Sequence, residues 1–191
     1  MKKFISVVLV IIVIVIGVSV YLLNLATSTE IGEEIIIKSS MKKEEVTNLI
    51  MELQNEKGIV ELSSKESNSI TNRLLEDITV SEGIKVDAIN SKIENGMVHI
   101  QVPAEIKGKD VLLSAKGTIE SKGDKLIIEV ENLKSGKLEL PKDLIGDKLN
   151  EILNDENIQI QGNTIEINFE KLPFDLKDIE IKGDKLLVNK K

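Results

Sequence analysis

Residues 84–106 read IKVDAINSKIENGMVHIQVPAEI, with apolar side chains at every second position over most of the stretch. A period of two is typical of a β-strand that buries one face. Asn95-Gly96, near the middle, is a strong signal for a two-residue hairpin turn. The stretch therefore predicts two antiparallel strands that share one apolar face.

Irregularities in and near this hairpin predict that the sheet bends. The alternation changes phase between Ala88 and Ile89, as expected of a β-bulge or a sharp bend. Pro103 has no N–H to donate to a ladder, so its strand is either an edge at that point or bent. Gly117 interrupts a later alternating run, where it allows tight curvature or a close approach of another backbone. We therefore expect a strongly curved sheet.

Alternation elsewhere in the chain predicts that the sheet continues. The runs are Ile59–Leu62, Val111–Ile119, Leu126–Val130, Leu138–Leu140, Ile158–Phe169 and Ile179–Ile181. Other segments carry apolar residues at helical spacing. They predict a first helix from Ser39 or Ser40 to Gly58, a second from Ser63 to about Leu75, and a third from Pro141 to about Leu153. This mixture predicts an α+β fold, in which about three helices pack on a mainly antiparallel sheet.

The second of these helices begins with the pattern of a capping box. Ser63 stands at the cap position, and Glu66, three residues later, can reach back to it. Only Ile70 and Leu74 form an apolar stripe along this helix. We therefore expect it to lie on the surface of the domain.

The N-terminus carries twenty residues, Phe4 to Leu23, without charge or proline. As a helix they span about 30 Å, the thickness of a bilayer's hydrocarbon core. Lys2 and Lys3 before them predict a cytoplasmic N-terminus. We predict an anchor in residues 1–26, a stalk in residues 27–38 and one extracytoplasmic domain in residues 39–191. A cleaved signal peptide, ending at the weak Ala26-Thr27-Ser28 pattern, is the alternative.

Composition narrows the chemistry that the domain can perform. The chain has no cysteine, which excludes disulfides, thiolate metal sites and lipoprotein attachment. Its net charge is −7, and without Lys2 and Lys3 the outer part carries −9. An acidic domain with few aromatic side chains is poorly suited to nucleic acid, which favours basic grooves and stacking platforms. We predict no nucleic-acid partner.

No sequence pattern predicts catalysis, a metal site or a cofactor. His99 is the only histidine, and its alternation with Val98 and Ile100 places it on a polar strand face. A serine cluster follows Leu62, but it lacks a Gly-x-Ser-x-Gly elbow and a nearby histidine. We predict a protein that is not an enzyme.

A curved sheet with one apolar face either packs a filled core or leaves a groove. An aliphatic groove with few aromatic residues suits acyl chains, which bind through shape and dispersion. The sequence leaves both alternatives open. For a groove, the candidate lining residues are Leu74, Val86, Ile100, Val102, Leu113, Ile128 and Leu149.

Two segments resemble motifs of the YpmS-like family of membrane-anchored bacterial envelope proteins. Residues 60–68, VELSSKESN, followed by Ile70 and Leu74, are similar to its strand, Leu-Ser/Thr, acidic, Asn and apolar-helix motif. Residues 131–141, ENLKSGKLELP, resemble its Gly-x-Leu-x-Leu-Pro segment. Some related envelope proteins resemble tubular lipid-binding domains, in which a curved sheet wraps a helix and holds lipid. The resemblance implies lipid binding and supplies no catalytic residues.

These observations predict a membrane-anchored, extracytoplasmic and non-catalytic domain that binds lipid or another apolar ligand. The alternative is an envelope scaffold with a filled core that docks a protein partner through its acidic surface or a strand edge.

Overall fold

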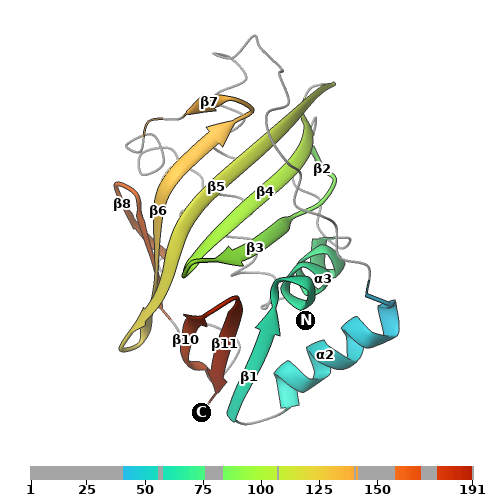
Figure 1. The fold of residues 1–191 in the computed structure, drawn as a ribbon, viewed down its shortest axis with the longest axis vertical. Coiled ribbons are helices and arrows are strands. Elements are labelled where there is room, and N and C mark those ends of the chain that lie inside the picture. The colour runs from blue at the N-terminus through green and yellow to red at the C-terminus, as the bar shows by residue number, and fades with distance from the viewer. Residues whose placement is uncertain are drawn as a thin grey trace.

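The computed structural model describes residues 41–55, 58–75, 84–106, 108–139, 141, 158–168 and 176–190. Within these ranges the chain forms two helices and eleven strands (Figure 1). The helices are α2 (Lys43–Asn55) and α3 (Ser64–Leu75). The strands are β1 (Gly58–Ser63), β2 (Ile84–Val86), β3 (Asn90–Glu94), β4 (Met97–Ile106), β5 (Lys109–Lys122), β6 (Lys125–Ser135), β7 (Leu138–Glu139), β8 (Ile158–Gln161), β9 (Thr164–Asn168), β10 (Leu176–Lys182) and β11 (Lys185–Lys190).

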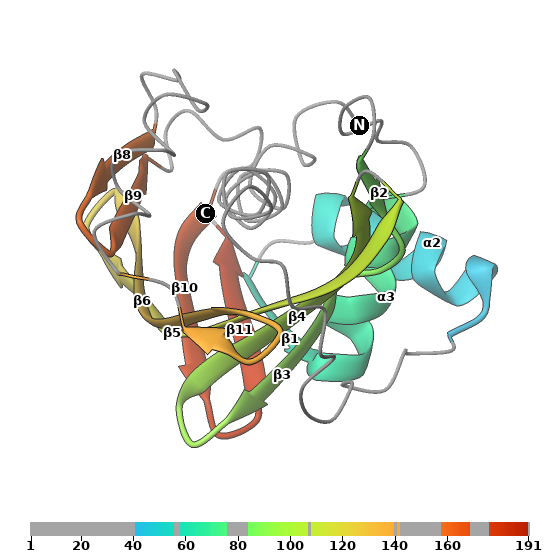
Figure 2. The same cartoon turned by 90° about the horizontal axis from the view of Figure 1, so that it is seen from above.

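The strands form two antiparallel sheets. The larger has the order β2-β4-β5-β6-β9-β8, with β3 beside β4 and β7 beside β6. Seen from above, it follows a curved path from β2 round to β8 (Figure 2). The smaller has the order β1-β11-β10 and joins β1, early in the chain, to the last two strands. The predicted α+β fold with a curved, mainly antiparallel sheet is confirmed. The runs Ile59–Leu62 and Ile179–Ile181, expected to continue that sheet, lie instead in the smaller sheet as β1 and part of β10.

The two sheets meet at the turn end of the β5–β6 hairpin. The Ser121 hydroxyl on β5 donates to the carbonyl of Ile179 on β10 at 2.9 Å and accepts from its N–H at 2.6 Å. A core of aliphatic side chains joins both sheets and both helices, including Val46, Leu62, Ile70 and Ile167. The buried residues of this core are all aliphatic, so it is held together by contacts between Val, Ile and Leu side chains.

The ladder is interrupted at the change of phase that the sequence shows between Ala88 and Ile89. Residues 87–89 leave the ladder between β2 and β3, at the predicted change of phase. Pro103 lies opposite this interruption, and its carbonyl accepts the Asp87 N–H at 3.0 Å. β4 pairs with β5 on one side and with β2 and β3 on the other, so Pro103 belongs to an inner strand, at the point where the second ladder is interrupted.

The capping box is confirmed, whereas the predicted surface position of α3 is wrong. Asn68 and Ser69 are only 3% and 7% exposed, so this helix buries polar side chains. The expectation failed because it counted only apolar residues as buried, and polar side chains bury well when they are hydrogen-bonded.

The predicted anchor and stalk in residues 1–38 and the third helix lie outside the described ranges. Within those ranges, no helix has the length and apolar character to cross a bilayer.

Candidate functional site

The curved sheet carries a continuous apolar face, and the candidate lining residues of the central strands share it. Val102 on β4 lies directly opposite Leu113 on β5, and Val86 on β2 lies opposite Ala104 on β4. Ile128 on β6 faces Ile119 on β5. Directly opposite residues point to the same side of an antiparallel sheet. Val86, Ile100, Val102, Leu113 and Ile128 therefore share a face, while the side chains of Leu74 and Leu149 lie outside the described residues.

Gly117, in the middle of β5, marks the point where this face is hollowed. It lies opposite Val98 on β4 and Val130 on β6. The pairing steps from Lys116 opposite Asn132 to Gly117 opposite Val130, so Glu131 is an extra residue and β6 bulges there. The bulge brings the β6 backbone close to β5, which explains why position 117 on β5 is a glycine.

A side chain at position 117 would collide with the main chain of β6. A Cβ atom there would overlap the carbonyl oxygen of Glu129 and lie 3.1 Å from its carbonyl carbon. Gly117 keeps an ordinary strand conformation, so this contact and not a positive φ requires glycine. The close backbone approach predicted at Gly117 is confirmed.

Asn163, in the turn between β8 and β9, completes the hydrogen bonds of the bulge. Its backbone carbonyl accepts the Val130 N–H at 2.9 Å, and its side-chain amide donates to the Val130 carbonyl at 2.9 Å. The backbone N–H and carbonyl of Val130, at the bulge, both have hydrogen-bond partners as a result. The bulge is a fixed feature of the fold, held from the neighbouring hairpin.

The small residues Gly117 and Ala115 leave a partly open hollow of about 40 Å³ on the apolar face. Larger aliphatic side chains from the strands on either side surround it. Its lining comprises Val98, Ile100, Ala115, Gly117, Ile119, Ile128, Val130 and Ile165, with Lys116 and Thr118 at its margin. An apolar cavity of about 150 Å³ accepts benzene. The enclosed part of the hollow accordingly fits a methyl group or the end of an alkyl chain.

Of the candidate lining residues whose side chains are described, two lie in the packed interior, two line the hollow, and Val86 is half-buried outside both. Val102 and Leu113 are each 1% exposed, so they belong to the packed interior. Ile100 and Ile128 are half-buried and line the hollow. Sequence reasoning missed Ala115, Ile119 and Ile165, although each lies in an alternating run. The missing information was the register that places them around Gly117.

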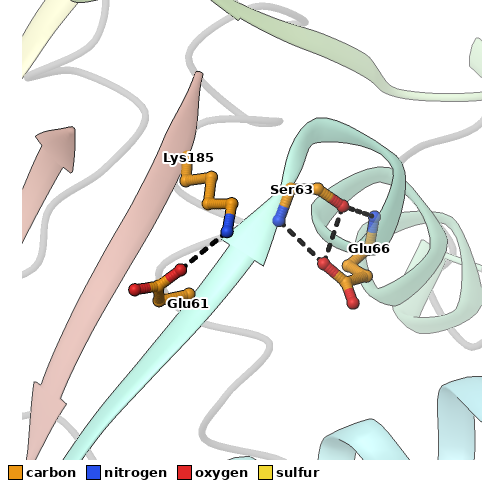
Figure 3. Close-up of polar contacts among 4 residues, drawn as sticks. All are labelled: Glu61, Ser63, Glu66 and Lys185. Carbon is orange, nitrogen blue, oxygen red and sulfur yellow. Dashed lines mark hydrogen bonds and ion pairs between the residues drawn. The ribbon is translucent and has the colours of Figure 1, made fainter. Parts of the chain in front are cut away.

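The polar clusters of the described chain are structural. Glu66 accepts from the Ser63 N–H at 2.8 Å and from its hydroxyl at 2.6 Å, and the Ser63 oxygen accepts the Glu66 N–H at 3.3 Å (Figure 3). The Ser63 hydroxyl bond lowers the pKa of Glu66. Nearby, Lys185 lies 2.7 Å from Glu61 and lowers the pKa of that exposed carboxyl by hydrogen bond and charge (Figure 3).

These contacts complete a helix N-terminus and join the neighbouring strands β1 and β11. His99 is half-buried on the polar face, opposite Lys116. The part of the chain that the structure describes contains no group of three or more carboxylate, histidine or cysteine side chains able to hold a metal ion.

Comparison of the chain with protein-family models, with characterised proteins and with solved structures finds no match. The hollow beside Gly117 is therefore interpreted from its own geometry.

Proposed function

We propose that this protein is a membrane-anchored, extracytoplasmic domain that binds an apolar ligand, with an acyl chain as the favoured one, and performs no catalysis. The observation that carries the proposal is the aliphatic hollow beside Gly117. Its lining offers contact surface to an alkyl group and almost no polar surface to anything else. The YpmS-like resemblance and the apolar segment Phe4–Leu23 support a place at a membrane, where acyl chains are abundant.

The size of the hollow defines what part of a lipid it takes. About 40 Å³ accommodates the last carbons of a chain, and the half-buried Ile100 and Ile128 extend apolar contact beyond it. A transferred CH₂ group gains about 0.8 kcal/mol, so a few buried carbons give weak, reversible binding. The proposal is for contact with a chain end, and not for a carrier that encloses a whole lipid.

A photoreactive, clickable fatty acid fed to cells that produce the full chain tests the proposal. Cells incorporate it into their lipids, and irradiation joins lipid to whatever lies against its alkyl chain. We expect adducts on peptides that contain Ile100, Ala115 or Ile128. Adducts confined to residues 4–23 would show that lipid contacts only the anchor, and would refute the proposal.

A pair of variants on one strand sharpens this experiment. Ala115→Val fills the hollow, whereas Ser114→Val places the same side chain on the opposite face of β5. We expect Ala115→Val to reduce labelling of the Ile100 and Ile128 peptides several-fold, and Ser114→Val to leave it unchanged. Equal labelling of both variants would exclude the hollow as the binding site.

A second candidate, which differs from the filled-core scaffold of the sequence analysis, is a domain that docks a protein whose apolar side chain enters the same hollow. A photoreactive amino acid at position 100 then traps a protein of defined mass instead of lipid. Position 101, on the opposite face of β4, serves as the control.

The membrane orientation has its own test. The chain contains no cysteine, so Glu94→Cys, at an exposed strand position, introduces a single thiol. A membrane-impermeant maleimide added to intact cells should label it. Labelling only after lysis would place the domain in the cytoplasm.

A further inference from the structure

Helix α3 lies along the free edge of β3, in the place where a further strand would pair (Figures 1 and 2). β4 occupies one side of β3, through the register from Asn90 opposite Gln101 to Glu94 opposite Met97. On its other side the backbone groups of alternate residues point toward the helix. Unpaired groups at such an edge are a template for pairing with another chain.

Side chains of α3 bind these edge groups one after another. The Asn68 amide accepts the Ser91 N–H at 2.6 Å and donates to the Ser91 carbonyl at 2.9 Å. The Asn72 amide accepts the Ile89 N–H at 2.8 Å and donates to the Ile89 carbonyl at 2.9 Å. An amide side chain that both accepts from and donates to one residue reproduces the bonds of a neighbouring strand.

Ser64, at the start of the helix, adds a third contact. Its hydroxyl oxygen accepts the Ile93 N–H at 3.0 Å. The helix thus binds Ile93, Ser91 and Ile89 in turn, and Asn68 also accepts the Ser91 hydroxyl at 2.6 Å. These contacts satisfy five backbone groups, three on β3 and two on Ile89 just before it, without a further strand.

The spacing of the binding side chains along α3 matches the spacing of the bound residues along the strand, so a straight helix can follow the strand. Ser64, Asn68 and Asn72 are four residues apart, a rise of about 6 Å per step in an α-helix. The bound strand residues are two apart, a rise of about 6.8 Å per step in an antiparallel strand. Over two steps the difference is within the reach of a side chain.

The covered edge is complementary to itself. In a two-fold antiparallel pair centred on Ser91, that residue would lie opposite its own copy, and Ile89 would lie opposite Ile93 of the second copy. The groups now bound by α3 belong to residues 89, 91 and 93, and these are the residues that would exchange hydrogen bonds in this register. The isoleucines would also meet on one face.

We propose that α3 is an edge cap, and that Ser64, Asn68 and Asn72 hold it on a strand edge through which two copies of the chain would otherwise pair. The partner of the uncovered edge is β3 of a second copy. The proposal does not depend on the proposed ligand.

Cysteine cross-linking of the full chain in isolated membranes tests this proposal. Asn68→Leu with Asn72→Leu keeps the side chains close in size and removes the bonds to the strand. Ser91→Cys in this background places two thiols at a Cα separation of about 5.5 Å in the proposed pair, within the range for a disulfide. We expect a disulfide-linked dimer on mild oxidation, and at least ten-fold less dimer from Ser91→Cys with Asn68 and Asn72 intact.

Position 94 supplies the matched control. Glu94→Cys is equally near the edge, but in the two-fold register its copy lies about 20 Å away along the strand. Equal cross-linking at positions 91 and 94 would indicate non-specific association and overturn the proposal. A folded double variant that gives no dimer at position 91 would overturn it as well.

Hydrogen exchange of the unmodified chain keeps the proposal testable if the double variant does not fold. The amides of Ile89, Ser91 and Ile93 should exchange at least a hundred-fold more slowly than an exposed amide, because α3 covers them. Rapid exchange at these three positions would show that the cap is not held in place.

Discussion

The segment between β2 and β3 and the bulge in β6 both break the regular ladder of the larger sheet, and asparagine completes the hydrogen bonds at each. At the first break the amide of Asn72 comes from a helix and binds Ile89, and the amide of Asn68 binds Ser91 of β3 beside the break. At the second, Asn163 comes from a hairpin turn and binds Val130 within the sheet. The outer break is covered by α3, whereas the inner break leaves a hollow.

The difference follows from what lies beside each break. The outer break has a free side, which a whole helix can occupy. The inner break lies between two strands, and the bulged backbone forces the neighbouring residue to be glycine. A missing side chain on an apolar face leaves space that the surrounding isoleucines do not fill. Asparagine side chains therefore bind the backbone at both breaks, but the edge at β3 is covered by a helix, whereas the bulge in β6 leaves a hollow beside Gly117.

Gly117→Val should have the largest effect on the free energy of unfolding. The new side chain meets main-chain atoms of Glu129, which cannot move without disturbing the bulge. We expect a loss of about 3 kcal/mol, at the upper end for overpacking. The urea midpoint of the full chain, measured by pulse proteolysis, gives the value. Ser114→Val on the opposite face of β5 is the control, and equal losses for both would contradict the close approach.

Asn72→Ala should have the next largest effect, because it leaves both the N–H and the carbonyl of Ile89 without their partner. Each unsatisfied buried group costs roughly 1–3 kcal/mol, and partial access of water reduces the sum, so we expect a loss of about 2 kcal/mol. Asn48→Ala, at an exposed position of α2, should change the same midpoint by less than about 0.5 kcal/mol. A loss as small as the control's would mean that the helix does not bind this edge.

Asn163→Ala should cost less than Asn72→Ala, because only the side-chain bond to the Val130 carbonyl is lost. The backbone carbonyl at position 163 still accepts the Val130 N–H. We expect about 1 kcal/mol. The neighbouring exposed variant Gln161→Ala measures the cost of changing this hairpin alone. A larger loss in the free energy of unfolding for Asn163→Ala than for Asn72→Ala would contradict this expectation. It would mean that the Asn163 side chain stabilises the bulge by more than its one hydrogen bond to Val130.

The smallest effect is the pH dependence contributed by Glu66 beside the covered edge. Its hydrogen bonds to Ser63 lower the pKa of its carboxyl in the folded state, so the unfolded chain binds the proton more tightly. The stabilisation is complete above the ordinary glutamate pKa of about 4.3 and is lost as pH falls through the lowered folded value. Glu66→Gln should remove this part of the acid sensitivity, visible as a flatter dependence of the urea midpoint on pH below about 5. An unchanged profile would exclude Glu66 as a contributor.

Much of the fold was predictable from short-range patterns. Alternation and Asn95-Gly96 predicted the β3–β4 hairpin. The change of phase after Ala88 predicted the break between β2 and β3, and Ser63 with Glu66 predicted the start of α3. These predictions held because each depends on interactions between residues close in the chain or on the pleat of a single strand.

The alternation in the sequence was enough to predict which strands carry an apolar face, and it left Gly117 open between tight curvature and a close backbone approach. That the asparagines of α3 bind a strand edge became visible only in the tertiary structure. Asn68 and Ser91 are 23 residues apart, and Asn68 binds the backbone N–H and carbonyl of Ser91, which every residue type except proline has. The tertiary structure also decided where the hollow lies. Its walls come from β4, β5, β6 and β9, and only the register between those strands places Val98, Val130 and Ile165 around one missing side chain. Register between distant strands depends on the packing of the whole sheet, which no single stretch of sequence contains.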